Sequence, residues 1–508
     1  MDEKLIEELR EARARAYDYA RPEAVAKVHA RGHLTARERI AALIDPGSLV
    51  EFGILAESPG MEGPADGLVN GIASIDGCSV VVASYDYSVY GGTQTGINHG
   101  KLDRMIELAY DNRWPFICFA DGGGARAQNL GGAGGGFSRG LSGRFGTFDG
   151  MAALSGWVPT VAVVAGRSFA GNASIAGFSD FIVATRGSAI GMGGPPLVEA
   201  ALGLKLTPEE LGPSEMHEQV GGIDLLVDDE PAAITAARQY LAYFLGDRPD
   251  AGPSATAETI NAIVPANRRR AYDMRRVVEA LADAGGVFEL RPNWARSAIT
   301  SLIRLGGRSV GVIANQPLSD IAGAIDSAAS DKIARFVQLC DAFDLPIVSL
   351  IDNPGFMLGP QAEKAGIARH HARTIMAHYH RTVPLYSVQI RKAYGLGPSG
   401  MGAGTSTRSD VRLAWPTAES GGMGLEGAAS LVRRDEIRSA AGAGAARAIR
   451  EDFATEVRAR GSGLTAGRRY SFDDIIEPSE TRQRLIALMR HAIPSPERHQ
   501  KKHYVDTW

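Results

Sequence analysis

The chain has 508 residues, of which 44% are hydrophobic and 22% charged, as in a globular protein with a full-sized core. A net charge of -4 argues against a basic nucleic-acid-binding face and against a polybasic membrane patch. Three widely spaced cysteines, Cys78, Cys118 and Cys340, exclude a disulfide scaffold and fit a reducing compartment. We therefore expect a cytoplasmic protein without a nucleic-acid or membrane partner.

The first 44 residues show a helical pattern of charged and apolar residues, which Asp45-Pro46-Gly47 ends as a turn. After this turn, short β-branched segments alternate with longer helical patterns, which is typical of an α/β fold with strands buried on both faces. The strands predicted for the first half are residues 79–83, 116–119, 160–164 and 181–184. The apolar stretch 149–167 is too short to span a membrane, so we expect a buried strand with its flanks.

The second half of the chain repeats the order of the first. Each half contains a helix, a proline, a short apolar strand, an aspartate and a glycine turn. The matching positions are Lys101, Pro115 and Asp121 in the first half, and Lys332, Pro346 and Asp352 in the second. The helices are expected over 102–112 and 333–343. A repeat of this length indicates two copies of one domain, residues 1–260 and 261–508, with a Gly- and Pro-rich linker over 246–259.

Glycines and other small residues cluster where strands of both halves end, and the chain holds 61 glycines in all. The clusters are Gly122–Gly124, Ala170-Gly171-Asn172 and Gly395-Leu396-Gly397. A lone glycine is explained by turn geometry, but clustered small residues leave backbone N–H groups uncovered. Two such groups aimed at one point form an oxyanion hole. Acyl-CoA chemistry needs one, because removal of the α-proton puts negative charge on the thioester oxygen. Two domains predict two anion sites.

Several segments, in order along nearly the whole chain, carry a family resemblance. They are residues 34–40, 45–48, 121–126, 263–265, 272–275, 312–317, 336–344, 352–356, 391–395 and 414–419. In these segments the chain resembles the carboxyltransferase (β) subunits of biotin-dependent acyl-CoA carboxylases, such as propionyl-CoA and methylcrotonyl-CoA carboxylase.

The resemblance implies two duplicated crotonase-like α/β domains, with acyl-CoA bound mainly by the N-terminal domain and carboxybiotin by the C-terminal domain. It implies an active site between the N-domain of one subunit and the C-domain of another, usually in a hexamer. Biotin would arrive on a biotin carboxyl carrier or biotin carboxylase subunit, and this chain has no Ala-Met-Lys-Met-like attachment site. Carboxybiotin would release CO₂, the biotin anion would take the α- (or vinylogous γ-) proton, and the enolate would attack CO₂.

Residue by residue, the resemblance assigns the thioester enolate to Gly123 and Gly124, with Ala170 and Gly171 as the neighbouring junction. It assigns the biotin carbonyl oxygen to Gly355 and Phe356, with Leu396 and Gly397. The further predicted substrate and cofactor contacts are Arg126, Tyr394, Gly395 and Ser399, and no metal is expected.

The chain departs from the family pattern at two places beside these predicted contacts. Where Gly-Gly-Ala-Tyr-Asp is usual, this chain has Gly395-Leu396-Gly397-Pro398-Ser399. It also differs at residues 131–136 and at Arg139, after the first glycine turn. The resemblance therefore implies an altered acyl pocket.

Other patterns support competing functions less well. Gly395-x-Gly397-x-x-Gly400 fits a dinucleotide fingerprint, but it lies deep in the second repeat and not after the first strand of a βαβ unit. Residues 136–140 fit a nucleophile elbow without a preceding strand. Among the histidines of 370–380, only His371 and His378 share a helix face, which disfavours a metal site. A biotin-independent or sodium-pump-linked acyl-CoA decarboxylase stays open as an alternative, as does a non-catalytic assembly subunit.

Overall fold

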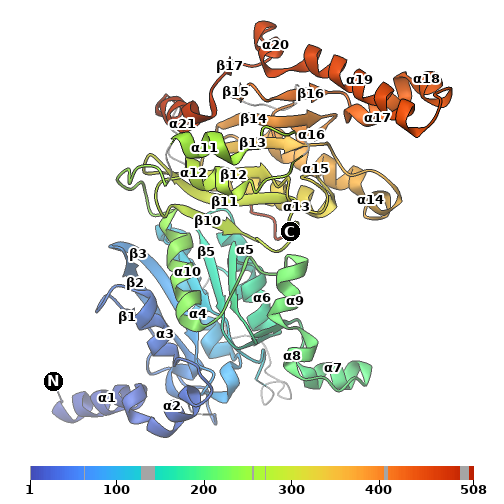
Figure 1. Cartoon of the computed structure of the whole chain (residues 1–508). Coiled ribbons are helices and arrows are strands. Elements are labelled where there is room, and N and C mark those ends of the chain that lie inside the picture. Colours follow the sequence, from blue (N-terminus) through green and yellow to red (C-terminus); the bar gives the residue numbers. More distant parts are fainter. Residues whose placement is uncertain are drawn as a thin grey trace. The chain divides into compact units, whose positions relative to one another are not determined.

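The computed structural model describes residues 2–61, 63–126, 144–254, 257–268, 270–404, 410–491 and 503–508. The chain divides into two compact units, Met1–Leu245 with Gln500–Thr507, and Gly246–His499 with Trp508 (Figure 1). The division lies before the boundary predicted near residue 260. The segment predicted as a linker belongs to the second unit, where the Arg248 N–H donates to the Gly307 carbonyl oxygen at 2.9 Å.

The N-terminal region contains three α-helices where the sequence suggested one helical segment: α1 (Glu3–Arg15), α2 (Pro22–His29) and α3 (Ala36–Leu43). Pro22 begins α2 because its missing N–H costs nothing at the first helical position. Thr35 begins α3 with a capping box, in which the Thr35 and Glu38 side chains each accept the other residue's backbone N–H. Local capping therefore divides the predicted helix.

The first unit is built on a seven-stranded sheet with the order β1-β2-β3-β4-β5-β7-β9. Its antiparallel strands are β1 (Val50–Glu51), β2 (Leu68–Ile75) and β3 (Cys78–Tyr85). Its parallel strands follow as β4 (Phe116–Phe119), β5 (Thr160–Val164), β7 (Phe181–Thr185) and β9 (Leu225–Val227). A small second sheet pairs β6 (Arg167–Phe169) with β8 (Ala189–Gly191). The predicted strands 116–119 and 160–164 are confirmed.

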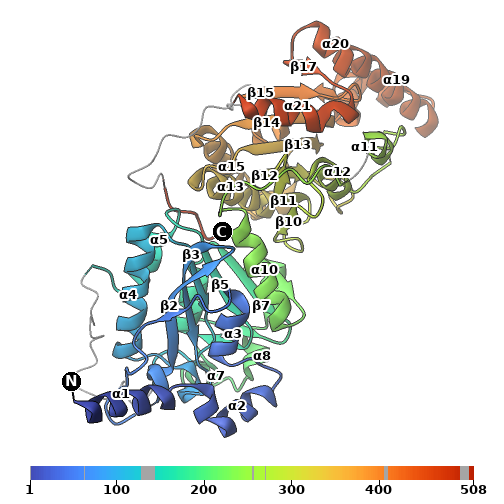
Figure 2. The same cartoon turned by 90° about the vertical axis from the view of Figure 1, so that its left-hand side faces the viewer.

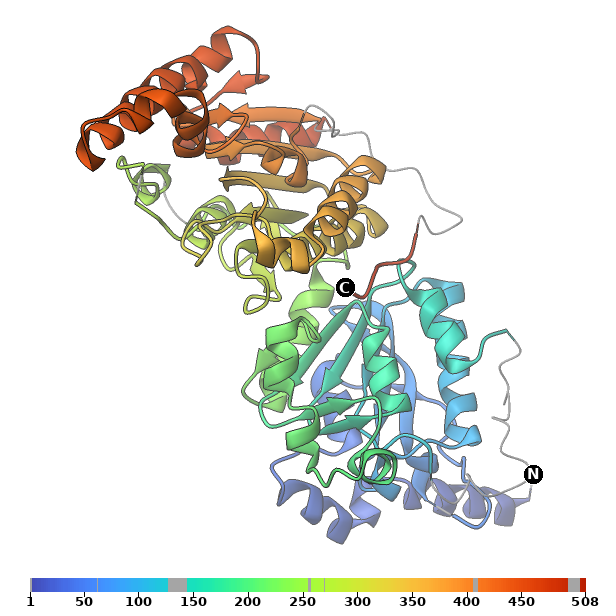
Figure 3. The same cartoon turned by 90° about the vertical axis from the view of Figure 1, so that its right-hand side faces the viewer.

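Helices cover both faces of this sheet (Figures 2 and 3). On one face lie α4 (Gly96–Asn112) and α5 (Thr147–Leu154), and on the other α3 and α10 (Glu230–Ala242). The predicted buried strand in the apolar stretch 149–167 is β5, and the flank before it forms part of α5, whose apolar residues face α4 at helical spacing. The remaining helices of the unit are α6 (Gly171–Gly177), α7 (Pro195–Leu202), α8 (Pro208–Leu211) and α9 (Ser214–Val220).

The second unit repeats this sheet, with the order β10-β11-β12-β13-β14-β15-β17 and β16 beside β14. Its antiparallel strands are β10 (Val287–Leu290), β11 (Ala298–Leu305) and β12 (Arg308–Asn315). Its parallel strands are β13 (Ile347–Asn353), β14 (Leu385–Tyr394), β15 (Val411–Ala414), β16 (Glu419–Gly421) and β17 (Asp474–Ile475). The same change from antiparallel to parallel pairing, at the same place, supports duplication of one domain.

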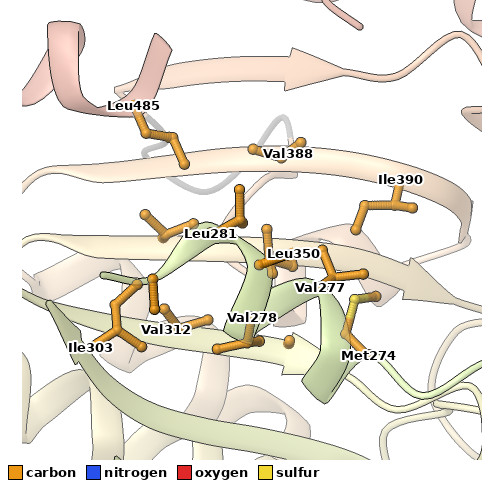
Figure 4. Packing of buried hydrophobic residues seen from close by; sticks show 14 of the residues in the cluster. Met274, Val277, Val278, Leu281, Ile303, Val312, Leu350, Val388, Ile390 and Leu485 are labelled. Atoms are coloured by element: carbon orange, nitrogen blue, oxygen red, sulfur yellow. The ribbon is translucent and has the colours of Figure 1, made fainter. Parts of the chain in front are cut away.

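Helices α13 (Ser327–Ala342) and α15 (Ile367–His380) pack together, with α13 against β11 and β12. The core on the opposite face involves α11 (Ala257–Ile263), α12 (Arg275–Leu281) and α21 (Thr481–Arg490). There Met274, Val278 and Leu281 pack against strand residues such as Val312 and Leu350 (Figure 4). Each such buried side chain contributes about 1.5–3 kcal/mol. The other helices are α14 (Pro360–Lys364), α16 (Gly397–Gly400), α17 (Leu425–Val432), α18 (Arg434–Arg438), α19 (Ala443–Gly461) and α20 (Gly463–Arg468).

A lysine occupies the same place in both units, partly buried as Lys101 and fully buried as Lys332. Lys101 of α4 donates from its Nζ to the carbonyl oxygens of Ala65 and Leu68. Lys332 of α13 donates to three carbonyl oxygens, those of Arg291, Trp294 and Ala298, at 2.8–2.9 Å. Burial lowers the pKa of both lysines to about 7. Each lysine therefore ties a helix to the start of a sheet strand in the same way.

Candidate active site

The two predicted junctions of the first unit run side by side. Gly122 bridges in parallel to Ser168: its N–H donates to the Arg167 carbonyl oxygen at 2.6 Å, and the Phe169 N–H donates to its carbonyl oxygen at 2.8 Å. Both segments then continue away from the sheet. Ala125 and Gly171 each lie three residues beyond this paired position.

The second unit has the same geometry. Asn353 at the end of β13 pairs in parallel with Ala393 near the end of β14. Phe356 and Leu396 each lie three residues beyond that pair. Ala125 and Gly171 of the first unit therefore correspond to Phe356 and Leu396 of the second.

Four of the predicted donor N–H groups already have acceptors inside the protein. The Gly123 N–H donates to the Gly91 carbonyl oxygen at 3.2 Å, and the Ala170 N–H to the Gly191 carbonyl oxygen at 2.9 Å. Side-chain oxygens accept hydrogen bonds from the other two N–H groups. The Gly124 N–H donates to Asn172 Oδ1 at 3.0 Å, and the Gly355 N–H to Asn353 Oδ1 at 3.1 Å.

The other four predicted donors have no such acceptor. No described residue accepts a hydrogen bond from the N–H groups of Gly171, Phe356, Leu396 or Gly397. The same holds within the described residues for Ala125, which the sequence analysis missed. Its neighbours bond to Gln94, whose N–H donates to the Gly124 carbonyl and whose carbonyl accepts the Arg126 N–H. Within the described residues, each unit thus holds a matched pair of N–H groups without an acceptor, Ala125 with Gly171 and Phe356 with Leu396, and Gly397 adds a third in the second unit. The match of Ala125 with Phe356 in the repeat was the signal that could have found Ala125.

A buried aspartate links the two junctions in each unit. Asp121 Oδ1 accepts the N–H groups of Ala165 and Gly166 at 3.0 Å, and Asp121 Oδ2 pairs with Arg39 at 2.8 Å. Asp352, which is fully buried, accepts from Arg391 Nε at 2.8 Å and from the Lys392 N–H at 3.2 Å. These carboxylates hold the end of the second strand against the end of the first.

Asp352 also organises the surroundings of the second junction. It accepts a hydrogen bond from the Tyr272 hydroxyl at 3.0 Å, and the Arg391 guanidinium lies over the Tyr272 ring, 4.7 Å from its centroid. Burial, together with the negative charge of Asp352, raises the pKa of Tyr272. The tyrosine therefore stays a neutral donor to the carboxylate.

The predicted cofactor contacts lie in different surroundings. Arg126 is 1% exposed, and its guanidinium pairs with Asp66 at 3.1 Å. The Tyr394 hydroxyl donates to Glu419 at 2.7 Å, and burial with this hydrogen bond raises the pKa of Tyr394. Gly395 adopts φ +57° and is exposed, whereas Ser399 in α16 is buried. Arg126 is therefore held in the interior of the first unit by its ion pair with Asp66.

Some competing patterns can be compared with the structure. The predicted nucleophile elbow at 136–140 and the altered segment with Arg139 lie outside the described residues. Within the described part of the chain, no cluster of three or more His, Cys, Asp or Glu side chains could hold a metal ion. His378 is fully buried with its Nε2 near the Gly400 carbonyl oxygen at 3.1 Å. None of the described helices combines the length and apolarity needed to cross a membrane.

A cavity of about 1290 Å³ lies in the first unit. It is lined by residues that follow the parallel strands, including Asp121, Gly166 and Arg186, and by α2 and α3. Ligands of α/β proteins bind at the carboxyl ends of such strands. At one wall, Glu230 accepts from Arg39 Nη2 at 2.9 Å and lies 2.7 Å from His33 Nδ1.

Glu230 predicts an acid-dependent loss of stability. Burial raises its pKa, but hydrogen bonds with His33 and Arg39 and the positive charge of Arg39 outweigh burial and hold the pKa at about 2, below the usual 4.5. A carboxylate with a depressed pKa stabilises the fold above its unfolded value and loses that contribution as pH falls toward its folded value. We expect the melting temperature to fall between pH 4.5 and about 2, and Glu230→Gln to flatten this fall. Asp228→Asn, which removes an exposed ion pair with Arg186, is the control; equal slopes for both variants would contradict the prediction.

The chain matches the family described as carboxyl transferase domain over residues 27–505, and it therefore belongs to this family. It is an enzyme of the carboxyltransferase group found in acyl-CoA carboxylases, with the crotonase-like fold in two duplicated domains. It is 36% identical over 498 residues to the methylmalonyl-CoA carboxyltransferase 12S subunit of Propionibacterium freudenreichii subsp. shermanii, covering 94% of this chain and 92% of that one. It is 34% identical to the propionyl-CoA carboxylase carboxyltransferase subunit of Haloferax mediterranei, covering 96% of each chain. It is also 34% identical to the methylmalonyl-CoA decarboxylase subunit alpha of Veillonella parvula, covering 94% of each.

Solved structures agree with this assignment. The transcarboxylase 12S crystal structure, described as a hexamer with methylmalonyl-coenzyme A and methylmalonic acid bound, matches with a TM-score of 0.84 and 34% identity. That match covers 99% of this chain and 96% of the other. A single-chain, multi-domain long-chain acyl-CoA carboxylase matches with a TM-score of 0.88 and 40% identity over 95% of this chain. The chain spans about half of that enzyme, 48% of its length.

Proposed function

We propose that this chain transfers a carboxyl group from carboxybiotin to the α-carbon of an acyl-CoA. In this proposal the first unit holds the thioester and the second unit holds biotin, carried by a separate carrier protein or biotin carboxylase subunit. The observation that carries it is the matched pair of free N–H groups in the two units. One such pair suits one developing oxyanion, and this reaction has two.

In the first unit, we assign the thioester oxygen to the N–H groups of Ala125 and Gly171. Gly123 and Gly124, which the sequence predicted for this role, become parts of the turn because their N–H groups have internal acceptors. Removal of the α-proton moves an electron pair toward the thioester oxygen, and the two N–H groups stabilise that charge. The enolate carbon then forms the new C–C bond with CO₂. Losing one oxyanion donor typically costs about 3 kcal/mol of barrier.

In the second unit, we assign the biotin carbonyl oxygen to the N–H groups of Phe356, Leu396 and Gly397. Carboxybiotin supplies the carboxyl group when it is bound. The three free N–H groups fit an oxygen acceptor, since donors without partners at a strand end are costly unless a ligand or water satisfies them. Backbone donors also need no ordering at the moment of reaction, because the sheet already fixes them.

Further details of the proposal come from the relatives. The hexamer described for transcarboxylase 12S supports a homohexamer for this chain. We propose that the first unit of one subunit faces the second unit of another in it. Its bound methylmalonyl-coenzyme A supports a CoA thioester as substrate. For Arg126 we propose a positioning role through Asp66 instead of direct contact with CoA phosphates, because it is buried. We keep Tyr394, Gly395 and Ser399 as residues that shape the second junction and the acyl pocket.

The test supplies the purified chain with a carboxybiotinylated carrier protein and a series of acyl-CoA esters. We expect carboxylated CoA products that disappear when the carrier is omitted. The 34% identity with a methylmalonyl-CoA decarboxylase subunit favours one second candidate, a decarboxylase. Consumption of a carboxylated acyl-CoA with no transfer to or from biotin would support that candidate. Absence of any turnover, with the assembled protein intact, would contradict both.

A further inference from the structure

An asparagine side chain fills the space between the two junctions in each unit, but it comes from opposite junctions. In the first unit it is Asn172, from the second junction, whose Oδ1 accepts the Gly124 N–H at 3.0 Å. In the second unit it is Asn353, from the first junction, whose Oδ1 accepts the Gly355 N–H at 3.1 Å. Gly124 and Gly355 hold the same place in the repeat, so the equivalent N–H group is bound by an asparagine from the second junction in one unit and from the first junction in the other.

A glycine faces each asparagine. A Cβ atom on Gly122 would collide with Asn172 Nδ2 and with the Gly92 carbonyl oxygen, and one on Gly397 would collide with Asn353 Oδ1. In the repeat, Gly122 corresponds to Asn353, and Gly397 corresponds to Asn172. The asparagine and its facing glycine have therefore exchanged places between the two units. One asparagine side chain fills the space between the junctions of each unit, and it comes from a different junction in the two units.

Neither asparagine is accessible to a substrate, because both are fully buried. Asn353 satisfies its Nδ2 with Asn315 Oδ1 at 3.2 Å. Asn172 Nδ2 has no hydrogen-bond partner among the described residues. A buried unpaired donor costs about 1–3 kcal/mol. Stability alone would therefore favour another residue at position 172, and the bond from Gly124 to Oδ1 is what the side chain provides.

We propose that Asn172 and Asn353 are positioning residues that orient the free N–H groups of Ala125 and Phe356. Peptide units are planar, so holding the N–H of Gly124 leaves only two backbone dihedrals before the N–H of Ala125. Gly124 and Gly355 both have positive φ values, +78° and +116°. Because a glycine has many accessible backbone conformations, each turn could adopt others without the hydrogen bond. The asparagine bond selects one of them. This inference rests on the proposed function, since it concerns the same two anion sites.

The first test compares Asn172→Gly with Asn172→Asp in the full chain. Asn172→Gly leaves the Gly124 N–H without an acceptor, so we expect kcat for carboxyl transfer to fall roughly 10²-fold, as for other misplaced catalytic groups. The KM for acyl-CoA should stay nearly unchanged, because ground-state binding does not depend on the oxyanion donors. Asn172→Asp keeps an oxygen acceptor and should restore most of the lost kcat.

Asn70 provides the matched control. It is also a fully buried asparagine of the first unit, and neither its Oδ1 nor its Nδ2 has a partner in the described structure. Asn70→Ala should change the melting temperature and leave kcat near the wild-type value. Equal kcat values for wild type and Asn172→Gly would overturn the inference, as would equal losses in Asn172→Gly and Asn172→Asp. If wild type itself transfers no carboxyl group, the proposed function fails instead.

The second test rebuilds the first unit's arrangement in the second unit, and it stands if Asn172→Gly does not fold. Gly397→Asn alone brings two side chains into one space, and Asn353→Gly alone removes the acceptor of the Gly355 N–H. The double variant Asn353→Gly/Gly397→Asn supplies the acceptor from the other side. We expect each single variant to lose kcat and the double variant to recover part of it, a coupling that independent sites do not show. A double variant no better than the worse single variant would overturn the inference.

Discussion

Replacing Gly124 by alanine should lower kcat for carboxyl transfer by about 10²-fold in a chain that still folds. Gly124 has φ +78°, and an added Cβ would lie 2.5 Å from the Ala170 Cβ in the neighbouring junction. The two junctions must then move apart, and with them the free N–H groups of Ala125 and Gly171. Steady-state kinetics with saturating acyl-CoA and carrier would measure the loss.

Gly203→Ala is the control for this prediction. Gly203 has φ +70° and no atom within 4 Å of an added Cβ, so it carries the same backbone penalty without a collision. That penalty is about 1–2 kcal/mol of stability. We expect Gly203→Ala to unfold at a denaturant concentration between those of the wild type and Gly124→Ala, and only Gly124→Ala to lose kcat. Similar kcat values for the two would remove the first junction from the site.

Replacing Asp352 by alanine should lower the free energy of unfolding by about 3–5 kcal/mol, because it leaves the buried Arg391 guanidinium without its carboxylate. Asp352 and Arg391 are 0% and 3% exposed and lie 2.8 Å apart, so water cannot replace the lost partner. The Tyr272 hydroxyl and the Lys392 N–H lose their acceptor as well. Equilibrium urea unfolding of the full chain would measure the change.

Asp474→Ala is the matched control in the same unit. Asp474 pairs with Arg484 at 3.3 Å, and both side chains are about half exposed. Exposed ion pairs contribute only about 0–1 kcal/mol, since water and salt screen them. A loss for Asp352→Ala no greater than for Asp474→Ala would contradict the proposed role of the buried carboxylate.

Much of the fold could be predicted from local patterns in the sequence. The strands at 116–119 and 160–164 are short, apolar and bounded by prolines and glycines, and each forms as predicted. The repeat of Lys101 and Lys332 predicted two copies of one domain, and each lysine donates to the first carbonyl oxygen of an equivalent strand, β2 and β11. The domain boundary was less accessible, because the segment after Leu245 has a linker composition and still pairs with the second unit.

The candidate N–H donors could be predicted less well from the residue types of the turns. Gly123 and Gly124 attract attention because they are glycines, yet their N–H groups bond to Gly91 and Asn172, which are remote in sequence. Ala125 is an ordinary residue, and its N–H has no described acceptor. Which N–H in a turn is free depends on what lies beside it, and the sequence of the turn does not contain that information.

The sequence by itself determined the class of fold, its duplication and the two strand-end junctions, because hydrophobic period and glycine clustering are local properties of the chain. Only the tertiary structure decided which backbone N–H groups at those junctions stay free, and that an asparagine from opposite segments holds each turn. The physical reason is that a hydrogen bond between distant residues is made by the packing of strands, and packing exists only once the sheet has formed.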